Sequence, residues 1–400
     1  IGINEANLEF RNSLYVIKLT GNEVTLDNLN VKAGSMLVTG NNNTIKNCTF
    51  RYITPFIHNP APVGKQIGGQ SIDSQWGLKE TCSAGVYVQG DGNKIISSYF
   101  AHSWSSGITL YGNRNLVENS FIEDVNWIGR RSAGINSFGN KNIVRFCTIQ
   151  KTGASCLEGG NAAWLNRYAR NNIWEHNMFR DACRLSVDQG FIYVNQQKGN
   201  NPKGNNIIRY NIGENVRGPD KGNWSNTCVG LYIDNNSSGY VIHNNIIINA
   251  REGLRYNDRA PSGVDVDVYN NTFYKCDKNV AIGVPPRYDA FDADVTFNNN
   301  IAFGSGNGLS DTMRGVEVGV NNIEKLDVKL LKDPNHYNFE LKRESLEIKG
   351  SPVKIYDAQL GPDASKIDYV GAVVPENGQF KSGCTIEKPD FAIENTMLKH

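Results

Sequence analysis

Short runs of alternating apolar and polar residues recur along most of the chain, and eight such segments align without internal gaps. Between their apolar anchors, 27 residues separate Val117 from Val144 and 34 separate Ile208 from Ile242. Alternation is the period of a β-strand, and self-similarity at a period of roughly 20 to 50 residues is typical of stacked repeats. The pattern predicts a β-solenoid with an interior row formed by Ile45, Ile95, Val117, Val144, Trp174, Ile208, Ile242 and Val268. The 50 residues between the first two anchors fit two coils.

Three residues after each anchor, the chain carries a small and mostly polar side chain. Equivalent residues of stacked coils lie about 4.8 Å apart along the axis. Side-chain amides at that spacing can hydrogen-bond to one another and satisfy the backbone at a bend. We therefore expect a ladder formed by Cys48, Ser98, Ser120, Cys147, Asn177, Asn211, Asn245 and Asn271.

A further strand accompanies each repeat, in segments such as GVYVQG (85–90) and GLYID (230–234). Alternation makes every second residue of a strand point to the same side. The inward set is expected to be Val86, Ile108, Ile135, Phe191, Leu231 and Leu254, and the outward set Tyr87, Thr109, Asn136, Ile192, Tyr232 and Arg255. One outer face of the solenoid should thus be polar and aromatic.

These repeats predict one all-β domain over residues 1–360, a right-handed parallel β-helix with an N-terminal cap at about 1–23. The alternating segment NFELKRESLEIKGSPVKI (338–355) is a candidate last coil. Residues 361–400 have weaker periodicity and are expected to form a C-terminal cap or tail, because a solenoid needs its open end covered.

The composition excludes several classes of function. A formal charge of +1 without a basic block argues against nucleic-acid binding, which depends on clustered Lys and Arg. No apolar run approaches a membrane span. The eight cysteines lack zinc-type spacing, and we expect buried thiols. Because the chain begins at Ile1 without a signal-like segment, any leader is expected to have been removed or to lie upstream.

Over about residues 24–355 the chain resembles the pectate-lyase-like right-handed β-helix superfamily. Locally, the segment SVDQGFIYV followed by VGLYID is similar to glycoside hydrolase family 141-like proteins, in which Asp-x-Gly-x-x-Tyr precedes Gly-x-Tyr-x-Asp. The resemblance implies a secreted or periplasmic enzyme, expected as a monomer, that acts on a plant or algal polysaccharide. It implies that Asp188 and Asp234 are the catalytic carboxylates and that Tyr193 and Tyr232 bind the substrate.

Several other side chains are candidates for substrate binding. Glu158 could be a third acid in the groove, and Arg184 and Arg255 could bind acidic groups of a substrate. Trp164 and Trp224 lie in insertions between strands, as do Trp104 and Trp127, and exposed rings there would stack on sugars. The groove is expected to cross Leu157, Ile192, Tyr232 and Arg255, with the insertions 161–170 and 195–204 as its walls.

Each candidate also has a structural interpretation. Asp is common in turns, so Asp188 and Asp234 could open turns, and each Arg could neutralise a neighbouring acid. A hydrolase needs no cofactor. The alternatives are a polysaccharide lyase, which in this fold would use Ca²⁺ or Arg with a base such as Lys198, Lys203 or Lys221, and a non-catalytic adhesin or tailspike-like protein.

Overall fold

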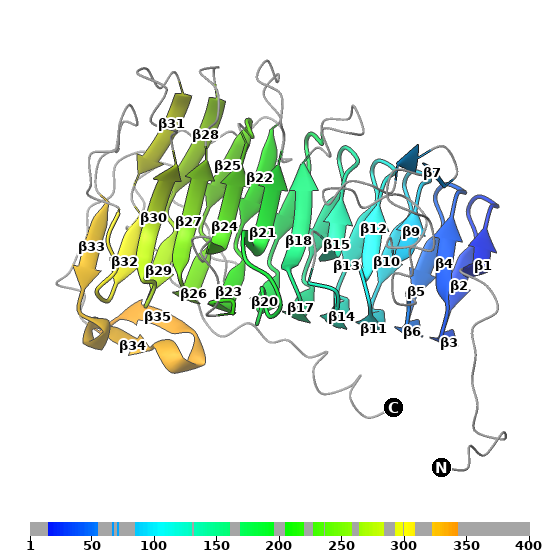
Figure 1. The fold of residues 1–400 in the computed structure, drawn as a ribbon, viewed down its shortest axis with the longest axis horizontal. Coiled ribbons are helices and arrows are strands. Elements are labelled where there is room, and N and C mark those ends of the chain that lie inside the picture. The colour runs from blue at the N-terminus through cyan, green and yellow to red at the C-terminus, as the bar shows by residue number, and fades with distance from the viewer. Residues whose placement is uncertain are drawn as a thin grey trace, which may run out of the picture.

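The computed structural model describes residues 15–54, 66–67, 70–71, 85–129, 132–160, 169–195, 205–219, 227–235, 237–257, 264–283, 293–298, 300–308 and 322–342. Within these residues, three parallel sheets run along one axis (Figure 1). Each successive coil adds one strand to each sheet, so the strand order follows the chain. The predicted parallel β-helix is confirmed. In the same residues the helical segments are two 3₁₀ turns, Val328–Leu330 and Pro334–His336.

The strands are short and have equivalent positions in successive coils. Sheet A contains β1 (Tyr15–Leu19), β4 (Ser35–Val38), β9 (Val86–Val88), β12 (Ile108–Leu110), β15 (Ala133–Ser137), β18 (Ser155–Gly160), β21 (Gln189–Asn195), β24 (Cys228–Asp234), β27 (Glu252–Asn257) and β30 (Lys278–Gly283). Sheet B contains β2 (Thr25–Asp27), β5 (Thr44–Lys46), β10 (Lys94–Ile96), β13 (Leu116–Glu118), β16 (Ile143–Arg145), β19 (Ile173–Glu175), β22 (Asn206–Arg209), β25 (Tyr240–His243), β28 (Val264–Tyr269) and β31 (Ala293–Asn298).

Sheet C contains β3 (Asn30–Lys32), β6 (Thr49–Arg51), β11 (Tyr99–Ser103), β14 (Phe121–Val125), β17 (Thr148–Thr152), β20 (Met178–Arg180), β23 (Ile212–Val216), β26 (Ile246–Ala250), β29 (Thr272–Tyr274), β32 (Ile301–Phe303) and β33 (Ile323–Leu326). Two antiparallel hairpins lie outside these sheets. They pair β7 (Gln66–Ile67) with β8 (Gln70–Ser71) and β34 (Leu331–Asp333) with β35 (Asn338–Leu341).

The interior row of sheet B is confirmed residue by residue. Every predicted anchor is buried, and successive anchors are register partners from Ile45↔Ile95 to Ile242↔Val268. Because Ile45 pairs directly with Ile95, the prediction of two coils in this interval is wrong. The intervening residues form one coil with a long insertion after β6. Large apolar side chains stacked in this way contribute about 1.5–3 kcal/mol each when fully buried.

Tight corners separate the three sheets, and they explain the abundance of Asn. Residues at equivalent corner positions have a left-handed backbone, as at Asn119 (φ 49°) and Asn244 (φ 52°) between sheets B and C. Asn adopts this conformation more readily than most residues. The predicted ladder follows directly after: Asn211 Oδ1 accepts from Asn177 at 3.0 Å, and its Nδ2 donates to Trp174 O at 2.9 Å and to Asn245 at 3.0 Å. It continues beyond the predicted set through Asn300 and Asn322.

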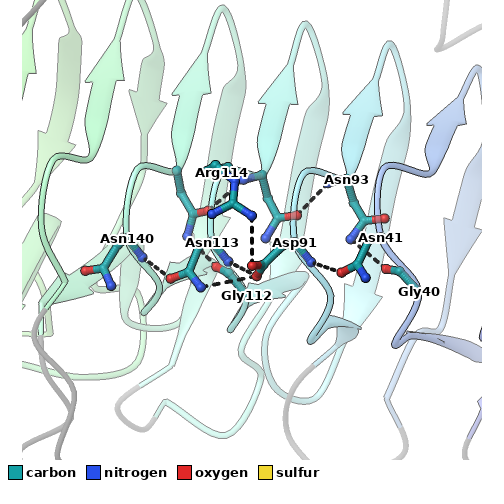
Figure 2. A network of polar contacts seen from close by, with 10 residues as sticks. Gly40, Asn41, Asp91, Asn93, Gly112, Asn113, Arg114 and Asn140 are labelled. Atoms are coloured by element: carbon teal, nitrogen blue, oxygen red, sulfur yellow. Dashed lines mark hydrogen bonds and ion pairs between the residues drawn. The ribbon is translucent and has the colours of Figure 1, made fainter. Parts of the chain in front are cut away.

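A second ladder at the corner between sheets A and B was not predicted. Asn41 Oδ1 accepts from the Asp91 backbone at 2.8 Å, Asp91 Oδ1 from the Asn113 backbone at 2.7 Å, and Asn113 Oδ1 from the Asn140 backbone at 2.9 Å (Figure 2). Arg114 pairs with the other oxygen of Asp91 at 3.1 Å. Each coil therefore satisfies a backbone donor of the next coil.

One inward–outward assignment on sheet A is wrong. Phe191 points into the core as expected, but Ile192 is also in the core, in register with Leu157 and Leu231. Two consecutive residues of β21 therefore belong to the core. Phe191 occupies space left by Gly213, where an added Cβ would lie 2.4 Å from the Phe191 ring. The outward residue of this coil is therefore Tyr193.

The two ends of the solenoid differ from expectation. β1 already pairs with β4 in sheet A, so the first described coil begins at Tyr15, inside the segment expected to be a cap. At the other end β33 is the last strand of sheet C, and the expected coil from Asn338 instead begins with the β34–β35 hairpin. Phe339 of this hairpin packs edge-on against Tyr274 with ring centroids 5.4 Å apart. Residues 343–400 lie outside the described residues.

Six cysteines fall in the described part of the chain, and all are buried free thiols, as predicted. Cys82 and Cys384 lie outside it. Desolvation raises the pKa of Cys147 to about 12, so this thiol stays protonated and behaves as a small apolar side chain.

A column of stacked rings follows the corner between sheets B and C. His243 lies between Tyr269, with ring centroids 4.9 Å apart, and Tyr210, 5.4 Å away. Burial lowers the pKa of His243 to about 3, because the charged imidazolium would lose its hydration. His176 is part of the same column, stacked on Tyr210 and Phe146. Both histidines are therefore ladder residues in this fold.

Replacing Asn211 by Ala should lower the free energy of unfolding by about 2–4 kcal/mol, because buried backbone and amide groups of two coils lose partners. Lys94→Ala, at an exposed position of β10, should change it by less than about 0.5 kcal/mol. Urea denaturation of both variants measures the difference. Equal stability of the two variants would show that the ladder contributes little.

Because the folded pKa of His243 is lower than that of an unfolded His, the unfolded chain binds the additional proton. Its contribution to stability is complete above about pH 6.5 and is lost as the pH falls towards 3. His243→Phe keeps the ring stack and should flatten this part of the stability profile. Denaturation series at pH 7, 5 and 4 test it, and parallel profiles of wild type and variant would contradict it.

Candidate active site

Two Asp–Tyr pairs connect adjacent coils on the outer side of sheet A. Tyr193 of β21 and Tyr232 of β24 are register partners, and their rings pack edge to face with centroids 5.1 Å apart. Tyr193 Oη donates to Asp234 Oδ2 at 2.8 Å, and Tyr232 Oη donates to Asp188 Oδ1 at 3.0 Å. Each tyrosine thus holds the aspartate of the other coil. The four residues of the sequence motif are brought together as one cluster.

Asp234 ends β24 with a fully satisfied carboxylate. Besides Tyr193, it accepts from the Asn235 backbone at 2.9 Å, from Asn235 Nδ2 at 2.7 Å and from Asn257 Nδ2 at 2.8 Å. Only 1% of Asp234 is exposed. Its neighbour in register, Asn195, donates to the Tyr193 hydroxyl at 3.0 Å. These hydrogen bonds hold the carboxylate in one orientation.

Asp188 lies in the turn before β21 and has a left-handed backbone (φ 62°). Its N–H donates to Thr227 O of the next coil at 2.7 Å, which fixes the turn against β24. In contrast to Asp234, Asp188 is only half-buried. It is therefore the more accessible carboxylate of the cluster.

The charge of this cluster is negative among the described residues. Arg255, the register partner of Tyr232, binds Glu252 with two hydrogen bonds of 2.6 and 2.7 Å. Burial opposes the charge of Arg255, but the contact with Glu252 outweighs it and raises the pKa of the guanidinium. Burial and the charges of Asp234 and Asp188 raise the pKa of Tyr232. Tyr232 is thus a neutral hydrogen-bond donor rather than a base near neutral pH.

Glu158 lies in the same outward row, as the register partner of Tyr193 and Asn136. The predicted row therefore needs correction at two positions. Leu157 and Ile192 belong to the buried core, and Glu158 and Tyr193 take their places on the outer side. Asn136, Tyr193 and Tyr232 have almost no exposed surface, so the polar contacts of the row form away from water.

Arg184 does not join this cluster. It is exposed in the turn before β21, with Nη1 3.9 Å from Asp124, and lines a cavity at the corner between sheets C and A. Trp164, Trp224, the insertion residues 161–168 and 196–204, and the lysines at 198, 203 and 221 lie outside the described residues. Asn257 and Glu252 were not predicted from the sequence, although both lie on β27, the strand that carries Arg255. Only their position on β27 places them beside the carboxylates.

No protein-family profile matches this chain, and no curated protein matches it in sequence. Among solved structures, it is similar to the PL6-family alginate lyase AlyGC, with a TM-score of 0.50 and 11% identity over 90% of this chain and 56% of that chain. Pectate lyase Pel9A matches with a TM-score of 0.49 and 13% identity over 76% and 70% of the two chains.

The catalytic unit of a GH87 alpha-1,3-glucanase from Streptomyces thermodiastaticus strain HF3-3 matches with a TM-score of 0.44 and 15% identity, over 78% of this chain and 60% of that chain. The match to AlyGC thus covers little more than half of that protein. At this level of identity the likeness concerns the fold, and it confirms the resemblance in that respect. The chain is a right-handed parallel β-helix.

The described residues were also considered for metal sites and membrane spans. They contain no group of three or more His, Cys, Asp or Glu side chains arranged to hold a metal ion. They also contain no helix with the length and apolar character of a membrane span.

Tyr193→Phe should destabilise the protein more than Tyr232→Phe. Tyr193 donates to a carboxylate with 1% exposure, whereas Asp188 can exchange its lost donor for water. We expect about 1–3 kcal/mol for the first variant and less than about 1 kcal/mol for the second, measured by chemical denaturation. Equal losses would show that the two aspartates are equally accessible.

Proposed function

We propose that the protein is a carbohydrate-active enzyme, specifically a glycoside hydrolase that cleaves a polysaccharide bound on the outer side of sheet A. The observation that carries this proposal is a surplus of carboxylates. Among the described residues, Asp188 and Asp234 bind the tyrosine pair, and Glu158 is the register partner of Tyr193. Arg255, the described cation of this row, already binds Glu252. Hydrolysis needs one carboxyl group to protonate the leaving oxygen and a second to act as base or nucleophile.

The same charge balance is unfavourable for a lyase. A lyase must neutralise the carboxylate of a uronate before it removes the neighbouring proton, and this cluster would repel that carboxylate. The neutral state of Tyr232 also makes it a poor base. The charges therefore support hydrolysis of a glycan without acidic groups. A secreted or periplasmic location, where polymers of this kind occur, is part of the same proposal.

Within this proposal, Asp188 and Asp234 form the catalytic pair. Asp188 is the carboxyl group that contacts the substrate, because part of its surface is exposed. The hydrogen bond from Tyr232 orients this carboxyl group. Asp234 acts as the second carboxylate and must exchange one of its donors for a proton of water or substrate. Arg255, held by Glu252, then borders the bound chain.

Asp188→Asn should lower turnover by roughly 10²-fold to 10⁴-fold, because it removes an ionisable group and keeps the shape. The free energy of unfolding should change by about 1 kcal/mol or less, since Asn tolerates a left-handed backbone. The assay incubates wild type and variant with neutral and uronate polysaccharides, and records both reducing ends and the ultraviolet absorbance of unsaturated products.

Asp27→Asn is the matched control, because Asp27 ends β2, the first strand of sheet B, and its carboxylate contacts Asn47 and Lys46. It should keep full turnover. Retention of more than about a tenth of wild-type turnover by Asp188→Asn would exclude Asp188 as an essential acid or base. Unsaturated products would identify a lyase, and the absence of any cleavage would favour a binding protein.

The Asp234→Asn variant keeps the shape of the side chain, but we do not expect it to keep the stability of the wild type. An amide at this position would set its NH₂ group against donors from Asn235 and Asn257. We expect about 1–3 kcal/mol of destabilisation together with lost turnover. Activity must therefore be compared at a temperature where both variants are folded, and unchanged stability would show that the four donors rearrange easily.

A further inference from the structure

The corner that follows sheet C carries a second surface, separate from the Asp–Tyr cluster. Successive coils place one residue there with a left-handed backbone, among them Tyr52 (φ 56°), His102 (φ 58°) and Asp124 (φ 51°). For a bulky side chain this conformation costs about 1–3 kcal/mol. Tyr52 gains little burial in return, because 47% of it is exposed. Folding alone therefore does not explain an aromatic residue at this position.

Four rings gather at this end of the corner. Tyr52 stacks on His102 with centroids 4.9 Å apart, and Trp127 contacts His102 at 6.2 Å and Trp104 at 5.7 Å. Asp124 orients two of them, because it bonds His102 Nδ1 at 2.8 Å and Trp127 Nε1 at 3.0 Å. The rings are thus held in place while Tyr52 and Trp104 remain exposed. Such a cluster is unusual on a water-exposed surface without a ligand.

A cavity of about 530 Å³ lies further along the same corner. Its polar lining includes Lys151, Asp181, Arg184, Asn215, Arg217 and Asn249. Arg184 connects the cavity to the rings, since its guanidinium lies 3.9 Å from Asp124. We call the four rings, Asp124 and the cavity the corner strip. From Tyr52 to Asn249 it crosses seven coils, or roughly 29 Å at one strand spacing per coil.

The cations of the corner strip are already balanced by acids. Lys151 lies 3.1 Å from Glu123, and Arg217 lies 2.6 Å from Asp277. Arg184 has Asp124 as its neighbour. A polyanionic ligand would have to displace these carboxylates. A ligand with many hydroxyl groups and apolar ring faces would not, because it can use the amides, the paired charges and the aromatic rings as they stand.

We propose that the corner strip is a binding site for a neutral glycan chain. Its sugar rings stack on Tyr52 and Trp104, and its hydroxyl groups bond the side chains of the cavity. The chain runs along the solenoid axis, so one polymer can follow several coils. This proposal rests on the proposed function in one respect, because both require that the protein binds a carbohydrate. It does not depend on Asp188 or on cleavage of the polymer.

The test is affinity electrophoresis of the full chain in gels that contain mixed-linkage β-glucan, glucomannan, arabinoxylan, alginate or polygalacturonate. Wild type should be retarded by at least one of the three neutral polymers. The double variant Tyr52→Ala/Trp104→Ala should bind that polymer at least roughly tenfold more weakly. Tyr52→Phe keeps the ring face and should bind like wild type. Each protein is also run in the Asp188→Asn background, so that binding and cleavage are measured separately.

Phe146→Ala is the matched control, because Phe146 is similarly exposed, at 46%, but lies at the corner between sheets B and C. It should leave binding unchanged. Equal weakening by Phe146→Ala and by the double variant would overturn the proposal, as would unchanged binding by the double variant. Binding to alginate or polygalacturonate alone, or to none of the polymers, would overturn it too. Absence of hydrolysis by the wild-type protein, with ring-dependent binding intact, would instead contradict only the proposed function.

Discussion

Each coil of this protein depends on the next coil for the partners of its backbone. Parallel strands three to seven residues long have no local hairpin to pair with, so their N–H and C=O groups find partners only across the 4.8 Å spacing between coils. At the corners, where the sheets end, side chains take over this task. The Asn177–Asn211–Asn245 ladder and the Asn41–Asp91–Asn113 ladder are repeated solutions to the same requirement.

This dependence also determines what can be built on the outside. Coils stacked in register bring equivalent side chains of adjacent coils into contact. The location of a side chain therefore follows from the coil and the strand position that it occupies. The crossed hydrogen bonds between Asp188, Tyr193, Tyr232 and Asp234 use this rule. Two similar coils each supply one acid and one hydroxyl group, and the acid of one coil meets the hydroxyl of the other. The result is one buried carboxylate, Asp234, and one half-buried carboxylate, Asp188, each held by a tyrosine of the adjacent coil.

The charges of the two surfaces distinguish between neutral and acidic polysaccharide ligands better than the shapes of these surfaces do. In the part of the chain that the structure describes, carboxylates outnumber the guanidinium of Arg255 around the Asp–Tyr cluster, and Lys151, Arg184 and Arg217 of the corner strip have acidic neighbours. Among the described residues, neither surface offers the uncompensated positive charge that a uronate polymer would require. The proposal of a neutral polysaccharide therefore follows from electrostatics on two independent parts of the molecule. The fold, which it shares with proteins of different activities, does not distinguish them.

The repeat in the sequence was sufficient to predict the β-helix, the interior row from Ile45 to Val268 and the first ladder, because burial and stacking select the same residue type in every coil. Asp188, Asp234 and their tyrosines were selected by the resemblance to a known family rather than by the repeat. The prediction from the repeat failed where local geometry departs from it. Alternation could not indicate that Phe191 and Ile192 both belong to the core, since the place of Phe191 depends on the space left by Gly213.

The tertiary structure alone decided which side chains meet across coils. The contact between Asn257 and Asp234 depends on the register of the strands. The path of the turns places Arg184 near Asp124 rather than near Asp188. Insertion lengths obscure that register in the sequence, as the single coil between Ile45 and Ile95 demonstrates. The physical reason is that the apolar character of each residue indicates whether its side chain is buried. A contact between two coils also depends on the number of residues inserted between those coils.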